Sequence, residues 1–228
     1  LIYNTSRLDQ LQDRLHTLQR FGKPKVELVF AARWLMDACR LSGPVEMSPI
    51  DLQRFAPAEC ERDNGSNRRF TIGRLSRDHA KKHHPNDIGI YHHLVSEGST
   101  VKIMGGRCLA GELDNVSEVT LLSAGAQEPD VFLKGLDCFF YRTSEKYFEP
   151  SGRVVSEAMA CGLPVVCHRR GGYSEYIEDR VDGFLFDTDA EAVEILLTLK
   201  ADPALRKRVG QAARKKLEAS LAPAVRDE

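Results

Sequence analysis

Between residues 69 and 217, short continuous apolar runs alternate with longer amphipathic stretches. The apolar runs predict buried strands, and the amphipathic stretches predict helices. Glycine or proline stands at many of the boundaries, where either residue commonly ends an element. The expected strands are residues 69–73, 101–106, 119–125, 136–141, 163–168 and 183–187, and the expected helices are residues 88–98, 129–135, 152–162, 190–200 and 203–217, with a helical turn at 173–177.

Single helices between consecutive strands are typical of the α/β class, in which a Rossmann-like parallel sheet is flanked by helices on both faces. Sheets of this kind bind ligands in the crevice outside the carboxyl ends of their strands. We therefore expect the functional residues in the loops that follow the strands.

The first 68 residues have a different pattern. Leucines at helical spacing predict a helix from Leu8 to Leu18, which precedes a short strand over 26–32 and a helix over 33–41. The following residues are turn-rich and without a period, as linkers between domains often are. We expect three parts: a remnant of an N-terminal domain (1–43), an interdomain linker (44–68) and the main domain (69–228).

Composition narrows the class of protein. Hydrophobic residues make up 42% and charged residues 29% of the chain, as in ordinary globular proteins. The formal net charge of -1 gives no global attraction to nucleic acid or to an anionic membrane. No apolar run approaches the roughly 20 residues that span a bilayer. The six cysteines contain no CxxC pair, so free thiols in a reducing cytoplasm are the simplest interpretation.

The segment Glu149–Val166 carries the candidate chemistry. Glu149 follows an expected strand, Gly152 opens the next helix, and Glu157 lies about one turn inside it. A helix N-terminus has unpaired N–H groups and a partial positive charge, so it binds phosphate readily. A carboxylate can accept two hydrogen bonds from a vicinal diol such as a ribose. One phosphate site flanked by two diol acceptors is what a nucleotide sugar requires.

This segment, EPSGRVVSEAMACGLPVV, resembles the E-x7-E signature of retaining GT-B glycosyltransferases of family 4, the glycosyl transferases group 1. SPIDLQRFAP resembles the interdomain linker of that family, FTIGRLSRD its first glycine–arginine loop, and YIEDRVDGFLF a later glycine-containing strand. The similarity covers roughly residues 49–217. It implies the C-terminal, donor-binding half of a GT-B fold.

The resemblance implies a role for each matching residue of the signature. Glu157 would bind the ribose hydroxyls, and Glu149 would contact the donor sugar as the candidate catalytic residue. The backbone of Gly152, Arg153 and Val154 would hold sugar hydroxyls and the distal phosphate.

The resemblance also implies two cations at the diphosphate, Arg74 and a lysine shortly after it. Lys81 and Lys82 are adjacent; we favour Lys82, and the choice stays open at this point. Because such cations do the task of a metal ion in this family, neither a metal nor another cofactor is expected. Ser151 stands where an aromatic residue is common, which changes the expected shape of the donor-sugar pocket.

The implied function is transfer of a sugar from a nucleoside-diphosphate sugar to a glycan or glycolipid acceptor, with retention of configuration, in polysaccharide biosynthesis. Since little of an acceptor domain precedes the linker, we expect the isolated chain to be weakly active or inactive. Two alternatives stay open: a sugar-nucleotide 2-epimerase of the same architecture, and a non-catalytic nucleotide-sugar-binding module. We expect a cytoplasmic protein without nucleic-acid partners. Its basic stretch 206–216 is typical of a solvated helix face, with weak contact to the inner face of the membrane as the less favoured interpretation.

Overall fold

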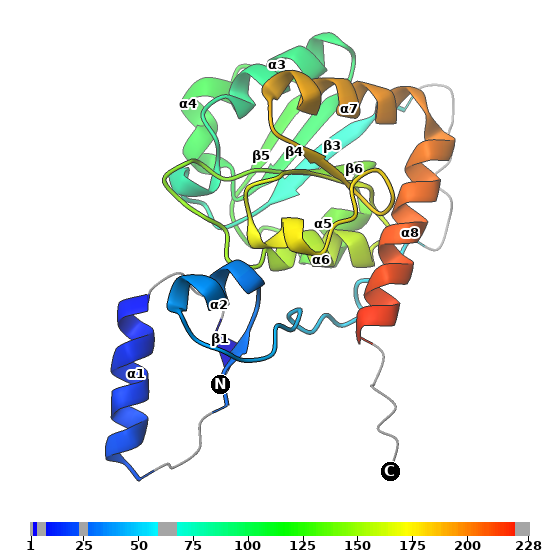
Figure 1. Cartoon of the computed structure of the whole chain (residues 1–228). Helices are drawn as coiled ribbons and strands as arrows, with labels where there is room; N and C mark the ends of the chain where they lie inside the picture. The colour runs from blue at the N-terminus through cyan, green and yellow to red at the C-terminus, as the bar shows by residue number, and fades with distance from the viewer. Residues whose placement is uncertain (1, 4–7, 23–26, 59–67, 222–228) are drawn as a thin grey trace.

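The computed structural model describes residues 2–3, 8–22, 27–58 and 68–221. Its main feature is a parallel sheet of six strands in the order β5–β4–β3–β6–β7–β8, which Figure 1 shows with helices on both faces. The predicted α/β class and Rossmann-like sheet are confirmed. The strands are β3 (Thr71–Leu75), β4 (Thr100–Met104), β5 (Val119–Leu122), β6 (Cys138–Tyr141), β7 (Val165–His168) and β8 (Phe184–Phe186).

The strand order changes direction at the centre of the sheet. From β3 the chain proceeds outward to β4 and β5, and then returns to β6 on the other side of β3. Strands β3 and β6 are paired through Gly73 and Phe139. The direction of winding therefore reverses between β3 and β6, and in sheets with such a switch point the ligand lies outside the carboxyl ends of these strands.

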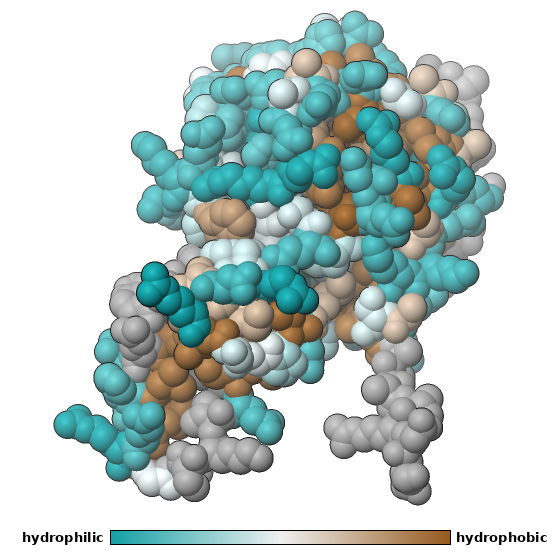
Figure 2. All heavy atoms as spheres, in the orientation of Figure 1, coloured by the Kyte–Doolittle hydropathy of each residue, from teal (hydrophilic) through white to brown (hydrophobic). Residues whose placement is uncertain are grey.

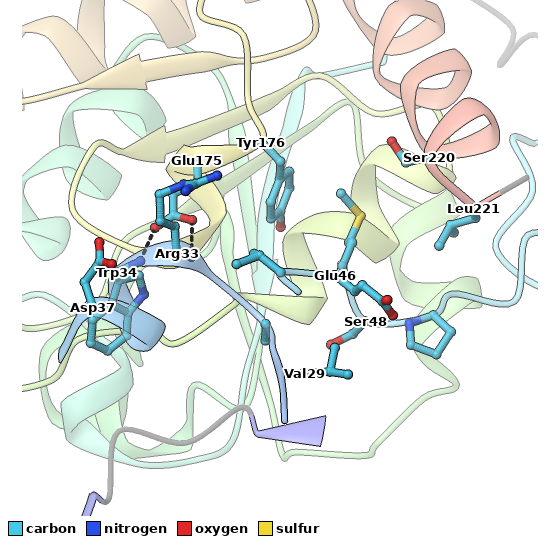
Figure 3. Close-up of a pocket in the computed structure, with 15 residues that line it drawn as sticks. Val29, Arg33, Trp34, Asp37, Glu46, Ser48, Glu175, Tyr176, Ser220 and Leu221 are labelled. Atoms are coloured by element: carbon cyan, nitrogen blue, oxygen red, sulfur yellow. Dashed lines mark hydrogen bonds between the residues drawn. The ribbon is translucent and has the colours of Figure 1, made fainter. Parts of the chain in front are cut away.

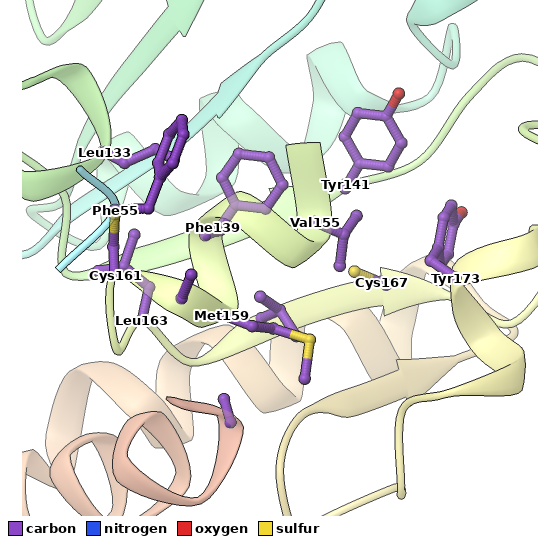
Figure 4. Packing of buried hydrophobic residues seen from close by; sticks show 14 of the residues in the cluster. Phe55, Leu133, Phe139, Tyr141, Val155, Met159, Cys161, Leu163, Cys167 and Tyr173 are labelled. Carbon is purple, nitrogen blue, oxygen red and sulfur yellow. The ribbon is translucent and has the colours of Figure 1, made fainter. Parts of the chain in front are cut away.

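Helices α3 (Asp87–Ser96), α4 (Ala110–Leu113) and α7 (Asp189–Ala201) cover one face of the sheet; α5 (Pro129–Lys134) and α6 (Arg153–Ala160) cover the other. Helix α8 (Pro203–Leu221) contributes to the cores on both faces. Successive side chains of β6 point to opposite faces of the sheet, so this strand contributes to both cores. Cys138 and Phe140 belong to the core under α3 and α7, whereas Phe139 and Tyr141 pack with α6 (Figure 4).

The N-terminal elements form a smaller unit beside the sheet (Figure 1). Strands β1 (Ile2–Tyr3) and β2 (Val29–Phe30) pair in parallel, and Val45 extends this pairing by bridging to Phe30. With α1 (Leu8–Arg20) and α2 (Arg33–Cys39) they enclose a core of Leu11, Phe30 and Leu35. Hydrophobic side chains gather over α1 and α2 in Figure 2.

Some predicted bounds are wrong. Within the predicted strand 26–32 only Val29–Phe30 is a strand among the described residues, which exclude residue 26. The helix predicted to reach residue 41 ends at Cys39, because Arg40 adopts the left-handed conformation with φ 53°. The turn predicted at 173–177 is the 3-10 helix η3 (Gly172–Glu175). In the part of the chain that the structure describes, no helix is long and apolar enough to cross a membrane.

Candidate functional site

Helix α6 starts from a backbone geometry that favours glycine. Gly152, directly before α6, has φ 66° and ψ 49°, a region that L side chains disfavour. A Cβ atom at this position would lie 2.5 Å from Cδ1 of Tyr173, a fully buried ring (Figure 4). Tyr173 therefore fixes the position at which α6 begins. The first N–H groups of α6 have no acceptor within the helix.

Glu149 is held in the β6–α6 loop by two donors. The residue is only 8% exposed. Its Oε2 accepts hydrogen bonds from Nζ of Lys82 at 2.6 Å and from the phenol of Tyr141 at 2.7 Å. Burial, and then the nearby Glu149, raises the pKa of Tyr141 well above its ordinary value, so the phenol stays protonated and donates. The carboxylate of Glu149 is thus fixed from two sides.

The structure separates the two adjacent lysines. Lys82 ends a short 3-10 helix, η1 (Ala80–Lys82), and is buried, with Nζ 4.3 Å from the centroid of the Tyr147 ring. The side chain of Lys81 is exposed. The main-chain carbonyl of Lys81 accepts hydrogen bonds from N and Oγ of Ser144, at 3.2 and 3.1 Å. Lys82 therefore lies beside Glu149, and Lys81 contributes only its backbone to the contact between the two loops.

Glu157 lies one turn inside α6 and is 8% exposed. Its Oε1 accepts a hydrogen bond from Nε of Arg153 at 3.1 Å. Burial raises the pKa of the Glu157 carboxyl, and Arg153 acts in the opposite direction. The Arg153 side chain is 58% exposed, so this ion pair joins a buried carboxylate to a cation at the protein surface.

Ser151 and Val154 are half-buried on either side of Gly152. The main-chain carbonyl of Ser151 accepts a hydrogen bond from the phenol of Tyr176 at 3.3 Å. Tyr176 follows η3, so a second tyrosine from that region steadies the backbone where α6 begins.

Arg74, expected at the diphosphate, lies inside the domain and is 1% exposed. Its Nη1 lies 3.3 Å from Oδ2 of Asp87 and 2.9 Å from the carbonyl oxygen of Arg142, and its Nη2 donates to the carbonyl of Lys82. Arg142 also pairs with Asp87, with Nε 2.8 Å from Oδ1. Both terminal nitrogens of Arg74 are therefore engaged within the protein, where they tie the loop after β3 to the loop after β6.

Two further residues with potentially reactive side chains, a histidine and a cysteine, are buried. His83 is 3% exposed, and its Nε2 lies 2.9 Å from the carbonyl oxygen of Gly105. Burial, with a smaller contribution from Arg74, lowers the pKa of His83 to about 3. Burial likewise raises the pKa of the Cys161 thiol to about 12. Over the described ranges, no group of three or more His, Cys, Asp or Glu residues is arranged to hold a metal ion.

An open cavity of about 990 Å³ lies between α2, residues 45–49 and η3 (Figure 3). At its edge the Glu175 carboxylate accepts hydrogen bonds from the main-chain N–H groups of Arg33 and Trp34, at 2.6 and 2.8 Å. The sequence alone does not indicate a role for Tyr141, Trp34 or Glu175. Their partners are remote along the chain, and the only local signal was an aromatic residue at the carboxyl end of a predicted strand, Tyr141.

Comparison with known proteins identifies the family. The family model described as glycosyl transferases group 1 matches residues 72–216. The spore coat protein SA of Bacillus subtilis is 34% identical over 80 residues, which are 34% of this chain and 21% of that protein. The D-inositol 3-phosphate glycosyltransferase of Arthrobacter sp. is 45% identical over 69 residues, 29% of this chain and 16% of that enzyme. The chain thus matches only a small part of these relatives.

Solved structures show the same fold. HepE of Anabaena, in complex with UDP and glucose, superposes with a TM-score of 0.73 at 19% identity, over 96% of this chain and 66% of that one. The C-terminal domain of LpcC, a glycosyl transferase group 1 family protein of Francisella tularensis, gives a TM-score of 0.59 at 18% identity, over 75% of this chain and 97% of that domain. These results confirm the resemblance: the chain belongs to the glycosyl transferases group 1 family.

Proposed function

We propose that the protein transfers a sugar from a nucleoside-diphosphate sugar to a glycan or glycolipid acceptor with retention of configuration, and that this chain is mainly the donor-binding domain. The observation that carries the proposal is the arrangement at the start of α6. Glu149 with its partner Lys82 lies before Gly152, and Glu157 lies one turn after it. The presence of UDP and glucose in the HepE structure supports this choice of ligand.

Each part of the donor would meet a group suited to it. The N–H groups of Arg153 and Val154 would hold the distal phosphate, because a helix N-terminus favours anions. The carboxylate oxygen of Glu157 that does not bind Arg153 would accept hydrogen bonds from the ribose hydroxyls. Glu149 would bind the donor sugar, and Gly152 would allow the backbone to approach it closely.

Bond cleavage places negative charge on the departing nucleoside diphosphate. Fixed donors aimed at that charge lower the barrier. The Lys82 ammonium is such a donor, since its contacts with Glu149 and Tyr147 fix its position. Arg74 would act on this charge from inside the domain, because it holds the carbonyl of Lys82. We propose that these cations and the α6 amides do this work without a metal ion.

The chain spans 66% of the HepE chain and less of the curated relatives. We therefore expect it to bind nucleoside diphosphates and to turn over slowly by itself. An acceptor carried on a lipid would bring the protein to a membrane surface, where the basic stretch 206–216 would meet anionic headgroups weakly.

Incubation with an isotope-labelled sugar nucleotide, followed by NMR, tests the proposal. With acceptor present, the label should move to the acceptor with its anomeric configuration kept. Conversion of the donor to its 2-epimer without acceptor would instead identify an epimerase. Binding of the donor with no reaction at any acceptor would identify a binding module.

A further inference from the structure

Trp34, the single tryptophan of the chain, contacts the residues on both sides of Glu149. Its indole Nε1 donates a hydrogen bond to the main-chain carbonyl of Pro150 at 3.1 Å. Its ring packs against Phe148, with ring centroids 4.2 Å apart and planes inclined by 54°. Residues 148 and 150 are thus held by one side chain that comes from α2, before the segment 72–216 that the family model matches.

The Pro150 carbonyl has little freedom to move. A Cβ atom at Gly172 would lie 1.8 Å from this oxygen, so the chain of η3 packs directly against it. In addition, Gly172 N–H donates to the carbonyl of Glu149 at 2.9 Å. The peptide groups that follow Glu149 are therefore enclosed between Trp34 and η3.

Helix α2 is itself held by the same region. Its N-cap residue, Ala32, has no side-chain hydrogen bond. Instead, the Glu175 carboxylate from η3 accepts hydrogen bonds from the two main-chain N–H groups at the start of α2 (Figure 3). This carboxylate replaces the missing cap. It also fixes α2, and Trp34 with it, relative to the β6–α6 loop.

We propose that Trp34 is a positioning residue for Glu149. It holds the backbone beside Glu149 in a fixed position relative to α2, and thereby orients the carboxylate that meets the donor sugar. The part concerning the sugar rests on the proposed function. Because Lys82, Glu157 and the α6 amides bind the nucleotide part, loss of Trp34 should affect recognition of the sugar and spare recognition of the nucleoside diphosphate.

The first experiment needs no ligand. Amide hydrogen exchange of Gly172, whose N–H donates to the Glu149 carbonyl, is compared in the 228-residue chain for wild type, Trp34→Phe and Arg33→Ala. The phenylalanine keeps a ring against Phe148 and removes the indole donor. Arg33→Ala is the matched control, because its exposed side chain is lost while its main-chain N–H still reaches Glu175. Exchange should be about fivefold faster in Trp34→Phe, the effect of one neutral hydrogen bond, and unchanged in the control.

The second experiment measures affinity by calorimetry. The nucleotide is the one that a screen of UDP, GDP, dTDP and ADP selects, and its glucose-bearing form is the second ligand. Trp34→Phe should bind the free diphosphate as the control does and lose about fivefold in affinity for the sugar form. Glu175→Ala, which releases α2 while leaving Trp34 intact, should give a loss in the same direction.

Equal exchange of the Gly172 amide in Trp34→Phe and Arg33→Ala would overturn the proposal, as would an equal loss for both ligands. If no nucleotide binds the wild type, the proposed function fails, and the exchange result still decides whether Trp34 positions the loop.

Discussion

Replacement of Gly152 by alanine separates two costs that the structure assigns to this position. The first is the left-handed backbone, with φ 66°, and the second is the contact of a new Cβ with Tyr173 at 2.5 Å. Gly125 has φ 75° and no atom within 4 Å of a Cβ, so it carries only the first cost. Gly89, in α3, has no neighbour within 4 Å and no positive φ, so it carries neither.

The expected free energies of unfolding follow from these geometries. Gly125→Ala should destabilise by about 1–2 kcal/mol, the cost of a left-handed non-glycine residue. Gly152→Ala should cost about 2–5 kcal/mol, because overpacking adds about 1–3 kcal/mol to the backbone cost. The Tyr173 ring cannot move away easily, since it packs edge-on against Tyr141 at 5.6 Å. Gly89→Ala should stabilise by about 0.5–1 kcal/mol.

Urea unfolding followed by circular dichroism measures all three variants against wild type. Calorimetry on Gly152→Ala should also show weakened nucleoside diphosphate binding, whereas Gly125→Ala should bind as wild type does. If Gly152→Ala costs no more than Gly125→Ala, Tyr173 does not define the start of α6, and the account of this loop is wrong.

Three other substitutions, and one matched control, test the charged and titratable groups around the site. Lys82→Met should destabilise by about 3–5 kcal/mol in urea unfolding, because it leaves the buried Glu149 carboxylate without its cation, and Lys81→Met should be neutral; equal effects would contradict the assignment of Lys82. Glu157→Gln should raise the free energy of unfolding at pH 7, since burial raises the pKa of Glu157 and so penalises its charged form. The same variant should lose about 1.5–3 kcal/mol of nucleotide binding in calorimetry, and unchanged affinity would refute the ribose assignment. Burial lowers the pKa of His83 to about 3, so the unfolded chain takes up the proton first as pH falls. Wild type should therefore lose about 2 kcal/mol more than His83→Gln between pH 7 and pH 5, and equal losses would show that His83 is not buried in its neutral form.

The sheet was predictable because most of its strands lie in short, mainly apolar runs with a glycine or proline nearby. Strand β6 and helix α6 illustrate this, since Gly135 and Gly152 mark where each segment begins. Elements of three or four residues were not predictable. Helices η1, η2 (Arg107–Leu109) and α4 are too short to show a period, and their place depends on contacts with distant segments.

The sequence indicated a candidate site where the residues concerned are close along the chain. Glu149, Gly152 and Glu157 belong to one loop and helix, so their spacing indicated a common site. The environment of Arg74 was not predictable, because Asp87 and the Arg142 carbonyl reach it only after the sheet has formed. Whether Arg74 also meets the diphosphate stays a prediction, as does the division of the chain into residues 1–43, 44–68 and 69–228.

The contribution of Tyr141 and Trp34 required the structure for a different reason. Tyr141 reaches Glu149 across the β6–α6 loop, and Trp34 comes from a part of the chain more than one hundred residues earlier. Neither residue lies in the E-x7-E segment. Tyr141 donates to the Glu149 carboxylate itself, and Trp34 donates to the neighbouring Pro150 carbonyl. No spacing in the sequence indicates either hydrogen bond.

A thermal-shift titration of the 228-residue chain with UDP, GDP, dTDP and ADP tests the central claim most directly, because a ligand of the native state raises the melting temperature. At a concentration of about 100 Kd the preferred nucleotide should add about 2.7 kcal/mol, which raises the melting temperature by roughly 5–10 °C for a domain of this size. Lys82→Met and Glu157→Gln should each reduce that shift, and Lys81→Met should keep it. No shift with any of the four nucleotides, or an undiminished shift in Lys82→Met and Glu157→Gln, would contradict a nucleoside diphosphate site at the start of α6.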